Sequence, residues 1–245
     1  MPDIEIRPSR QTALVTGATS GIGKEIAQQL ASAGHTVWVG ARSATKGRRC
    51  VEEIGGDARL LVLDVTDAAS ITAAVGEVDH MDVLVNNAGI NIAAAAAPDA
   101  TVESFRQTYE TNVFGVVAVT NAFLPMLRRS SHPRVVNISS GTGSLTWSTG
   151  SNPQFDHTAS AGTSAAYRSS KTALNALTVF YAQTLAAEGV KVNALAPGRR
   201  ATNLRAGVGG GDPAEAAAAA VRLALLPDGG PTGGFFSWDD TSVPW

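Results

Sequence analysis

Short apolar segments recur along the chain, each bounded by turn residues and separated from the next by a longer segment of helical character. The apolar segments are Ala13–Val15, Val37–Val39, Leu60–Leu63, Val83–Val85, Val135–Ile138 and Val190–Leu195. The first four are apolar at every position, which is typical of strands buried on both faces. The clearest helical segments are Ile22–Ala33, Ser70–Val78, Val102–Arg129 and Ala165–Glu188. This alternation predicts an α/β fold, with a doubly wound parallel sheet and helices on both faces.

Single residues mark several ends of these elements. Gly34 follows the first helical segment and Gly189 the last, positions where glycine ends helices, while Asp67 can cap the helix before Ile71. A short strand is expected within residues 233–238. No stretch rich in Pro, Gly or Ser divides the chain, so we expect one domain over residues 1–245.

The overall charge narrows the class of partner. The chain carries 19 basic and 21 acidic residues, a formal charge of −2, which gives no reason to expect nucleic acid or a membrane surface. Cys50 is the only cysteine, which excludes an intrachain disulfide and favours a reducing compartment. Residues 1–5 lack the pattern of a signal peptide, and we expect no apolar run long enough to span a bilayer. We therefore expect a cytoplasmic protein.

A glycine-rich turn, Thr16–Gly23, follows the first expected strand and opens the first expected helix. Glycine permits a tight turn and a close approach of the backbone to an anion, and a helix N-terminus offers free N–H groups to a phosphate. We expect a dinucleotide to bind at this turn, with the alternative being a turn without a ligand. The residues expected to contact it are Gly17, Ser20, Gly21, Ile22 and Gly23.

The residues after the second strand bear on the choice of dinucleotide. No acid occurs between Gly34 and Cys50 to bind ribose hydroxyls, and Arg42 stands near the end of the strand instead. A guanidinium can pair with a 2′-phosphate that a carboxylate would repel, so we expect NADP, bound through Arg42. The other basic residues nearby are interpreted as surface charges: Lys46, Arg48 and Arg49. The alternative is a solvated basic loop.

Polar residues follow the third and fourth strands. Asp64, with Val65 after it, could accept a hydrogen bond from an adenine amino group, or could equally cap a turn. Asn87, Ala88 and Gly89 suit a backbone that lies against a ribose, although they could merely pin neighbouring strands.

Tyr167 and Lys171 lie four residues apart in a long helical segment. Side chains at this spacing share one helix face, and an ammonium beside a phenol lowers the phenol's pKa. Such a tyrosine can exchange a proton with a carbonyl or hydroxyl group.

These motifs together resemble the short-chain dehydrogenase/reductase family, and its carbonyl-reductase-like branch in particular. The matching pieces, in chain order, are Gly17-x-x-x-Gly21-Ile22-Gly23, Asn86–Gly89, Asn112, Ser140, Tyr167-x-x-x-Lys171 and Pro197-Gly198. The resemblance covers the chain from about residue 11 to the end of the sixth strand. It implies a Rossmann-type sheet and hydride transfer at a nicotinamide.

The resemblance also implies roles for individual residues. Tyr167 would be the acid in carbonyl reduction and the base in alcohol oxidation, and Lys171 would lower its pKa and bind the nicotinamide ribose. Ser140, preferred over Ser139, would hydrogen-bond the substrate oxygen. Asn112 would position a water that links Lys171 to solvent, although it could be an ordinary amide that kinks a helix. Pro197 and Gly198 would pack beside the nicotinamide, with Thr202 near its carboxamide.

Two stretches depart from the family pattern. Ser140 and Tyr167 are farther apart than in most members, which indicates an insertion at about 147–162, over the substrate entrance. Its candidate pocket residues are Trp147, Phe155 and His157, with a surface flap as the alternative. An insertion here could cover the helix face that members use to form tetramers, which leaves monomer or homo-oligomer open. Arg199 and Arg200 are unusual; they could touch an acidic substrate or the cofactor phosphates, or face solvent.

We therefore expect an NADPH-dependent reductase of a ketone or aldehyde, reversible as an alcohol dehydrogenase, with residues 199–245 shaping the substrate side. No histidine or cysteine pattern suggests a metal. The alternatives are a 3-oxoacyl-thioester reductase and a non-catalytic NADP-binding regulator. The thioester reductase would need a basic docking patch, for which the candidates are Arg128, Arg129, Arg199 and Arg200.

Overall fold

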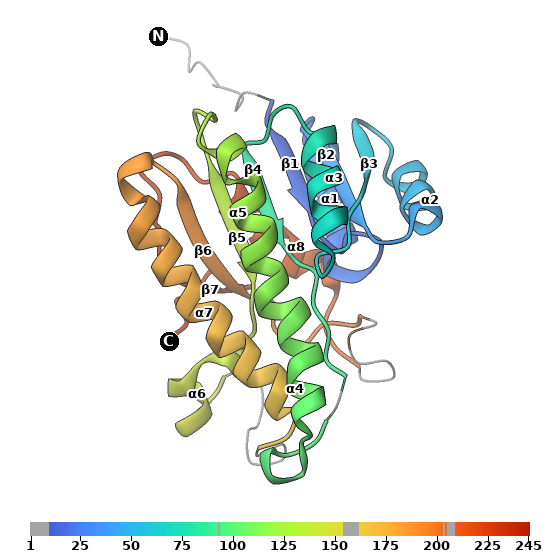
Figure 1. Ribbon diagram of the computed structural model, residues 1–245. Coiled ribbons are helices and arrows are strands. Elements are labelled where there is room, and N and C mark those ends of the chain that lie inside the picture. The colour runs from blue at the N-terminus through green and yellow to red at the C-terminus, as the bar shows by residue number, and fades with distance from the viewer. Residues whose placement is uncertain (1–9, 93, 154–161, 203, 205–208) are drawn as a thin grey trace.

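The computed structural model describes residues 10–92, 94–153, 162–202, 204 and 209–245. It contains a seven-stranded, all-parallel sheet in the order β3-β2-β1-β4-β5-β6-β7 (Figure 1). The strands are β1 (Thr12–Val15), β2 (Thr36–Ala41), β3 (Ala58–Val62), β4 (Val83–Asn86), β5 (Arg134–Ile138), β6 (Lys191–Ala196) and β7 (Phe235–Ser237). The order reverses between β1 and β4, the switch point at which open α/β sheets bind ligands outside the carboxyl ends of their strands.

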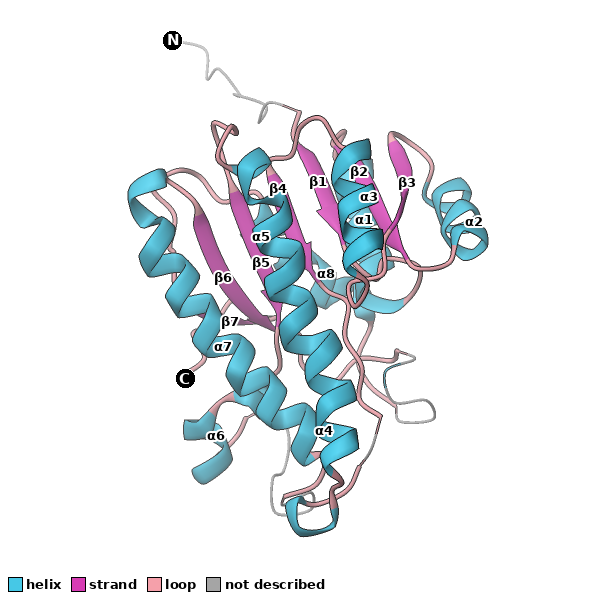
Figure 2. Ribbon diagram, in the orientation of Figure 1, coloured by secondary structure: helices cyan, strands magenta, loops and turns pink. Residues whose placement is uncertain are grey.

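Helices cover both faces of the sheet (Figure 2). The helices of one layer are α3 (Ala68–Glu77), α4 (Val102–Tyr109), α5 (Gly115–Leu127) and α7 (Ala165–Leu185). Those of the other are α1 (Gly21–Ser32), α2 (Ala44–Ile54) and α8 (Pro213–Ala224). Successive β1 residues point to opposite faces: Leu14 belongs to the core under α5, whereas Ala13 and Val15 belong to the core under α1 and α8. The sheet is therefore apolar on both sides, as its continuous apolar strands predicted.

Short elements connect these layers. Three are 3₁₀ turns, Ala97–Asp99, Gly141–Gly143 and Ala186–Glu188, and one is the five-residue helix α6 (Leu145–Thr149). A π-helical turn, Glu110–Phe114, joins α4 to α5. Figures 1 and 2 show α4 and the start of α7 extending past the carboxyl edge of the sheet.

Most element ends match their sequence signals. Gly34 and Gly189 adopt positive φ angles of 89° and 76°, and the Asp67 carboxylate accepts a hydrogen bond from the Ala69 N–H at the start of α3. The strand expected within residues 233–238 is β7.

Helix α2 was not among the predicted helical segments, and it contains a glycine, Gly47. Gly47 is required by close packing: a Cβ there would lie 2.3 Å from a methyl carbon of Leu60 and 2.9 Å from Cβ of Ala41. The helix is capped by the Ser43 hydroxyl and buries Cys50 against the sheet.

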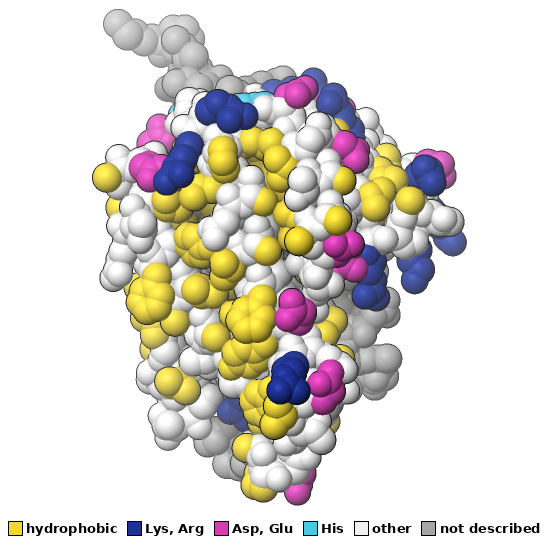
Figure 3. Space-filling model, in the orientation of Figure 1, with side chains coloured by type: hydrophobic (Ala, Val, Ile, Leu, Met, Phe, Trp, Pro, Cys, Tyr) yellow, Lys and Arg dark blue, Asp and Glu magenta, His cyan; other side chains and the backbone are white. Residues whose placement is uncertain are grey.

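The run Val102–Leu127 is long and apolar enough to cross a membrane by length and composition, contrary to our sequence reading. Half of its apolar window is buried inside the protein, where Val119, Phe123 and Leu127 pack against the sheet. Core helices pass the same test, so this run is weak evidence for a membrane span. Figure 3 shows apolar side chains on the surface over α5 and α7. The exposed large apolar residues include Phe180 of α7 and Phe114, the last residue of the π-helical turn.

Candidate active site

A cavity of about 530 Å³ lies at the carboxyl ends of β1, β2 and β4, at the switch point. Most of the residues expected at a dinucleotide line it: Gly17, Ser20, Gly21, Ile22, Gly23, Arg42, Asp64, Val65, Asn87, Ala88, Gly89, Tyr167, Lys171, Pro197 and Thr202. Three of the expected site residues do not: Asn112, Ser140 and Gly198. The cavity thus joins the glycine turn to the Tyr167–Lys171 pair.

The glycine turn is held against the loop that follows β4. Gly17 and Gly21 adopt positive φ angles of 63° and 55°, where other residues are strained. A Cβ on Gly17 would lie 2.9 Å from Cα of Ala88, and one on Gly23 would lie 2.3 Å from the Asn87 amide nitrogen. The three glycines therefore provide both the backbone conformation and the close approach.

Thr16 holds the loop after β4 in place, a role that was not predicted. Its hydroxyl oxygen accepts hydrogen bonds from the backbone N–H groups of Asn87 and Ala88, both at 3.0 Å. The Asn87 side chain donates in return to the Thr16 carbonyl at 2.9 Å. The signal was present, since a threonine preceding a glycine turn has a hydroxyl that can satisfy a neighbouring loop.

Arg42 stands just beyond β2 with an exposed side chain on the cavity wall. Arg49, by contrast, is paired with Glu53 at 2.8 Å on α2, in keeping with its interpretation as a surface charge. Asp64 accepts hydrogen bonds from the backbone N–H of Thr66 at 2.9 Å and from its hydroxyl at 2.7 Å. These bonds, with a smaller contribution from Arg42, hold the pKa of Asp64 below its usual value. Asp64 therefore caps a turn and lines the cavity at once.

Tyr167 and Lys171 share one face of α7, with the ammonium nitrogen 5.7 Å from the centre of the phenol ring. The ammonium donates a hydrogen bond to the Ile138 carbonyl at 2.8 Å. Burial lowers the pKa of Lys171 to about 8. Burial also raises the pKa of Tyr167 to about 12, and a hydrogen bond with Ser140 offsets this only in part. The expectation that Lys171 would make the phenol more acidic is wrong for this geometry, because burial dominates.

The two serines after β5 face different neighbours. The Ser140 hydroxyl lies 2.9 Å from that of Thr142 and hydrogen-bonds Tyr167. The Ser139 hydroxyl is buried and donates to the side-chain oxygen of Asn175. Although Ser139 lines the cavity, Ser140 is the serine whose hydroxyl reaches the phenol.

Asn112 is fully buried in the π-helical turn between α4 and α5. Its side-chain nitrogen donates to the Ile90 carbonyl at 2.9 Å and to the Ser170 hydroxyl at 3.0 Å. A Cβ built on Gly89 would lie 3.3 Å from the Asn112 oxygen and 3.6 Å from the Lys171 nitrogen, so the three residues are neighbours. π-Helical turns are frequent at functional sites. This turn places the Asn112 side chain beside Gly89 and Lys171.

Other expected pocket residues lie elsewhere. Trp147 is buried in a small cluster with Phe235 and Val243 and is not among the residues that line this cavity. The same cluster contains Ala194 and Ala196 of β6, so Trp147 contributes to the core at this end of the sheet. Phe155 and His157 lie outside the described residues.

The residues present fit a nicotinamide dinucleotide. The glycine turn leaves space that side chains would occupy, and it leads directly into the N-terminus of α1. Arg42 lies on the cavity wall near the end of β2. Among the described residues, no group of three or more His, Cys, Asp or Glu side chains could hold a metal ion.

Comparison with known proteins gives the same assignment. The family model described as short chain dehydrogenase matches residues 11–211. Short-chain dehydrogenase anuI of Penicillium roqueforti is 39% identical over 223 residues, which cover 86% of this chain and 87% of that protein.

Two solved structures show different nucleotides on the same fold. NADPH-bound carbonyl reductase from chicken fatty liver has a TM-score of 0.81 at 26% identity and covers 96% of this chain and 99% of its own. The 3-ketoacyl-(acyl-carrier-protein) reductase of Brucella melitensis, complexed with NADH, has a TM-score of 0.81 at 25% identity and covers 93% and 96%. This chain belongs to the short-chain dehydrogenase/reductase family of oxidoreductases.

Proposed function

We propose that this protein is an NADPH-dependent reductase of a ketone or aldehyde. One observation carries the proposal: the phenol of Tyr167 hydrogen-bonds Ser140, beside buried Lys171, in the cavity that begins at the glycine turn. When bound, the nicotinamide supplies the hydride that reaches the carbonyl carbon. The residues of this chain provide the proton and hold the groups in place.

The reacting oxygen becomes negatively charged as the hydride arrives. The Tyr167 hydroxyl donates its proton to that oxygen, and the Ser140 hydroxyl donates a hydrogen bond to it. A phenol with a pKa of about 12 is protonated at neutral pH, so it is ready to act as an acid.

Binding is divided along the cavity. The glycine turn and the N-terminus of α1 would hold the pyrophosphate, and Asn87–Gly89 would lie against a ribose. Lys171 would bind the nicotinamide ribose, and Pro197 and Thr202 would border the nicotinamide.

The choice of NADPH over NADH rests on Arg42. Its guanidinium is exposed on the cavity wall and could pair with a 2′-phosphate, and no carboxylate at the end of β2 would repel that phosphate. The carbonyl reductase with bound NADPH supports this choice, and the Brucella reductase with bound NADH supports the other.

A 3-oxoacyl-thioester reductase is the second candidate, since one similar structure is a 3-ketoacyl-(acyl-carrier-protein) reductase. The proposed docking arginines do not favour it. Arg128 is paired with Glu188, Arg129 donates to the carbonyls of Pro125 and Asp79, and the Arg200 side chain is buried. Arg199 alone of the four is exposed near the cavity end of β6 without such a contact in the described structure.

Oxidation of NADPH and of NADH should be measured with a panel of small ketones and aldehydes and with a 3-oxoacyl thioester. We expect turnover of a ketone or aldehyde with NADPH, and none by Tyr167→Phe. Faster turnover of the thioester would support the second candidate. Tight NADPH binding with no turnover of any carbonyl would indicate a regulator instead.

A further inference from the structure

Arg200 is a buried cation close to the cavity but not on its wall. Its side chain is 4% exposed, so its charge requires partners within the fold. Nε donates to the Pro197 carbonyl at 2.7 Å, and Nη1 pairs with the Glu215 carboxylate. The guanidinium carbon also lies 4.2 Å from the centre of the Trp238 ring, a cation–π contact.

These partners come from three distant parts of the chain. Pro197 follows β6, Glu215 lies in the first turn of α8, and Trp238 follows β7, where its backbone N–H donates to the Ala196 carbonyl at 3.0 Å. The packing is close, since a Cβ on Gly211 would lie 2.3 Å from Nη1 of Arg200. Arg200 thus joins the ends of two strands to the start of a helix.

The backbone on both sides of Arg200 is tied as well. The Ala201 N–H donates to the Gly211 carbonyl, and the Gly211 N–H donates to the Arg199 carbonyl, both at 3.0 Å. The backbone at residues 199–201 is therefore tied to that of Gly211.

Two residues that follow Ala201 form part of the cavity wall. Thr202 and Leu204 line the cavity, as does Pro197, whose carbonyl Arg200 holds. Thr202 also lies against the glycine turn, since its methyl carbon would be 3.1 Å from a Cβ on Gly21. The contacts of the Arg200 guanidinium and the backbone bonds beside it therefore hold this part of the wall against the turn.

We propose that Arg200 is a positioning residue that sets the affinity for the dinucleotide without touching it, by holding Pro197 and Thr202 over the glycine turn. The inference rests on the proposed nicotinamide nucleotide site. A lysine cannot replace Arg200, because a single ammonium cannot bond a carbonyl and a carboxylate in the fork geometry while stacking on an indole.

The chain offers a matched control in Arg134, the first residue of β5, at the end of the strands opposite to the cavity. Its side chain is 1% exposed; it donates to the carbonyls of Leu226 and Pro133 and pairs with the exposed carboxylate of Asp228 at 2.8 Å. Arg134→Lys therefore disturbs the same kind of buried arginine, far from the cavity.

Dissociation constants for NADPH and NADH should be measured by calorimetry for the wild type, Arg200→Lys and Arg134→Lys, well below the melting temperature of each. Both substitutions should lower the Tm. We expect Arg200→Lys to raise the Kd of the preferred nucleotide roughly tenfold, and Arg134→Lys to leave it close to the wild-type value. Trp238→Leu, which removes the stacked ring and keeps the ion pair, should shift the Kd in the same direction by a smaller factor.

Equal effects of Arg200→Lys and Arg134→Lys on the Kd, or no effect of either, would overturn the proposal and leave Arg200 a purely structural residue. If Arg200→Lys fails to fold, an unchanged Kd in Trp238→Leu overturns it equally. Because the readout is binding, the result stands even if the wild type reduces no carbonyl. A wild type that binds neither nucleotide would overturn this proposal and the proposed function together.

Discussion

The side-chain amide of Asn112 makes two hydrogen bonds with the backbone of one residue, Ile90. Its oxygen accepts from the Ile90 N–H at 2.8 Å, and its nitrogen donates to the Ile90 carbonyl at 2.9 Å. The loop after β4 is thereby fixed to the π-helical turn, and Gly89 is held beside Lys171. To bond both the N–H and the carbonyl of one residue, a short side chain must carry a donor and an acceptor, as an amide does.

Asn112→Asp should therefore destabilise the protein, although it only replaces the amide nitrogen with an oxygen. The carboxylate cannot donate to the Ile90 carbonyl or the Ser170 hydroxyl, and it would be buried with its charge. We expect a loss of about 3 kcal/mol in the free energy of unfolding, measured by urea denaturation. Asn121→Asp, the same change on the exposed side of α5, is the control and should have little effect.

Tyr167→Phe should lower kcat by roughly a hundredfold or more, because it removes the proposed proton donor, while the Kd for NADPH stays nearly unchanged. Tyr181→Phe is the control, since the Tyr181 hydroxyl donates to the Asn121 side chain away from the cavity. Steady-state kinetics and nucleotide titration separate the two effects. Substantial activity in Tyr167→Phe would mean that another group supplies the proton.

Arg42→Asp should shift the preference from NADPH toward NADH. A carboxylate at the cavity wall would repel a 2′-phosphate and accept hydrogen bonds from ribose hydroxyls. The ratio of kcat/KM for the two nucleotides should fall roughly tenfold or more. Arg48→Asp makes the same charge change on the exposed side of α2, away from the cavity, and should leave the ratio alone. An unchanged ratio in Arg42→Asp would remove Arg42 from the phosphate site.

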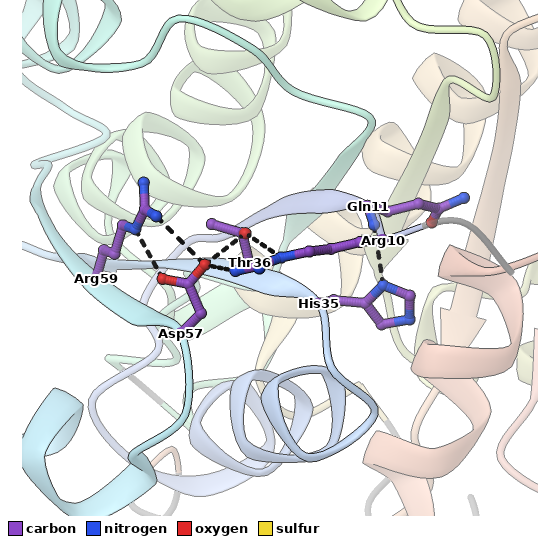
Figure 4. A network of polar contacts seen from close by, with 6 residues as sticks. All are labelled: Arg10, Gln11, His35, Thr36, Asp57 and Arg59. Atoms are coloured by element: carbon purple, nitrogen blue, oxygen red, sulfur yellow. Dashed lines mark hydrogen bonds and ion pairs between the residues drawn. The ribbon is translucent and has the colours of Figure 1, made fainter. Parts of the chain in front are cut away.

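His35 should make stability depend on pH in the mildly acidic range. Its ring nitrogen Nδ1 accepts a hydrogen bond from the Gln11 N–H at 3.1 Å, next to the Arg10–Thr36–Asp57 network (Figure 4). Burial, and secondarily the Arg10 guanidinium, lowers the pKa of His35 below its usual 6.5.

Because the unfolded chain takes up this proton first, the contribution of His35 to stability is present above pH of about 6.5 and is lost as the pH falls through its folded-state pKa. Tm values measured from pH 7.5 down to about 5 should show this decline. His35→Asn keeps an acceptor for Gln11 and cannot titrate, so its decline should be smaller; an identical decline would exclude His35 as the cause.

Ser164→Gly should stabilise the protein. Ser164 begins α7 with a φ of 55° and a ψ of 42°, and its buried hydroxyl has no hydrogen-bond partner among the described residues. Glycine relieves the left-handed strain and removes the orphan hydroxyl, a gain of about 1 kcal/mol. Ser164→Ala keeps the strain and should gain less. A lower Tm for Ser164→Gly would show that the hydroxyl makes a stabilising contact.

The fold and most of the cavity wall could be predicted because both depend on the chain's one-dimensional pattern. Parallel strands buried on two faces are apolar throughout, and their carboxyl ends meet at one edge, so Gly17 after β1 and Asn87 after β4 had to converge. Helix α2 was missed because Gly47, unfavourable in a helix, is needed where the helix touches β2 and β3.

Properties that depend on three-dimensional surroundings were beyond the sequence. The spacing of Tyr167 and Lys171 indicates proximity, but not the burial that raises one pKa and lowers the other, nor the competing bond to the Ile138 carbonyl. The contacts of Arg200 join residues 38 positions apart, and nothing in its local sequence indicates Trp238.

The place of Trp238 has a consequence for how the protein acquires its activity during synthesis. Folding during translation proceeds from the N-terminus, so the glycine turn leaves the ribosome early. The indole on which Arg200 rests is made more than two hundred residues later, after β7. A nascent chain should therefore adopt most of the sheet before it can bind nucleotide tightly, and stalled chains that end before β7 should be folded in large part yet weak in binding.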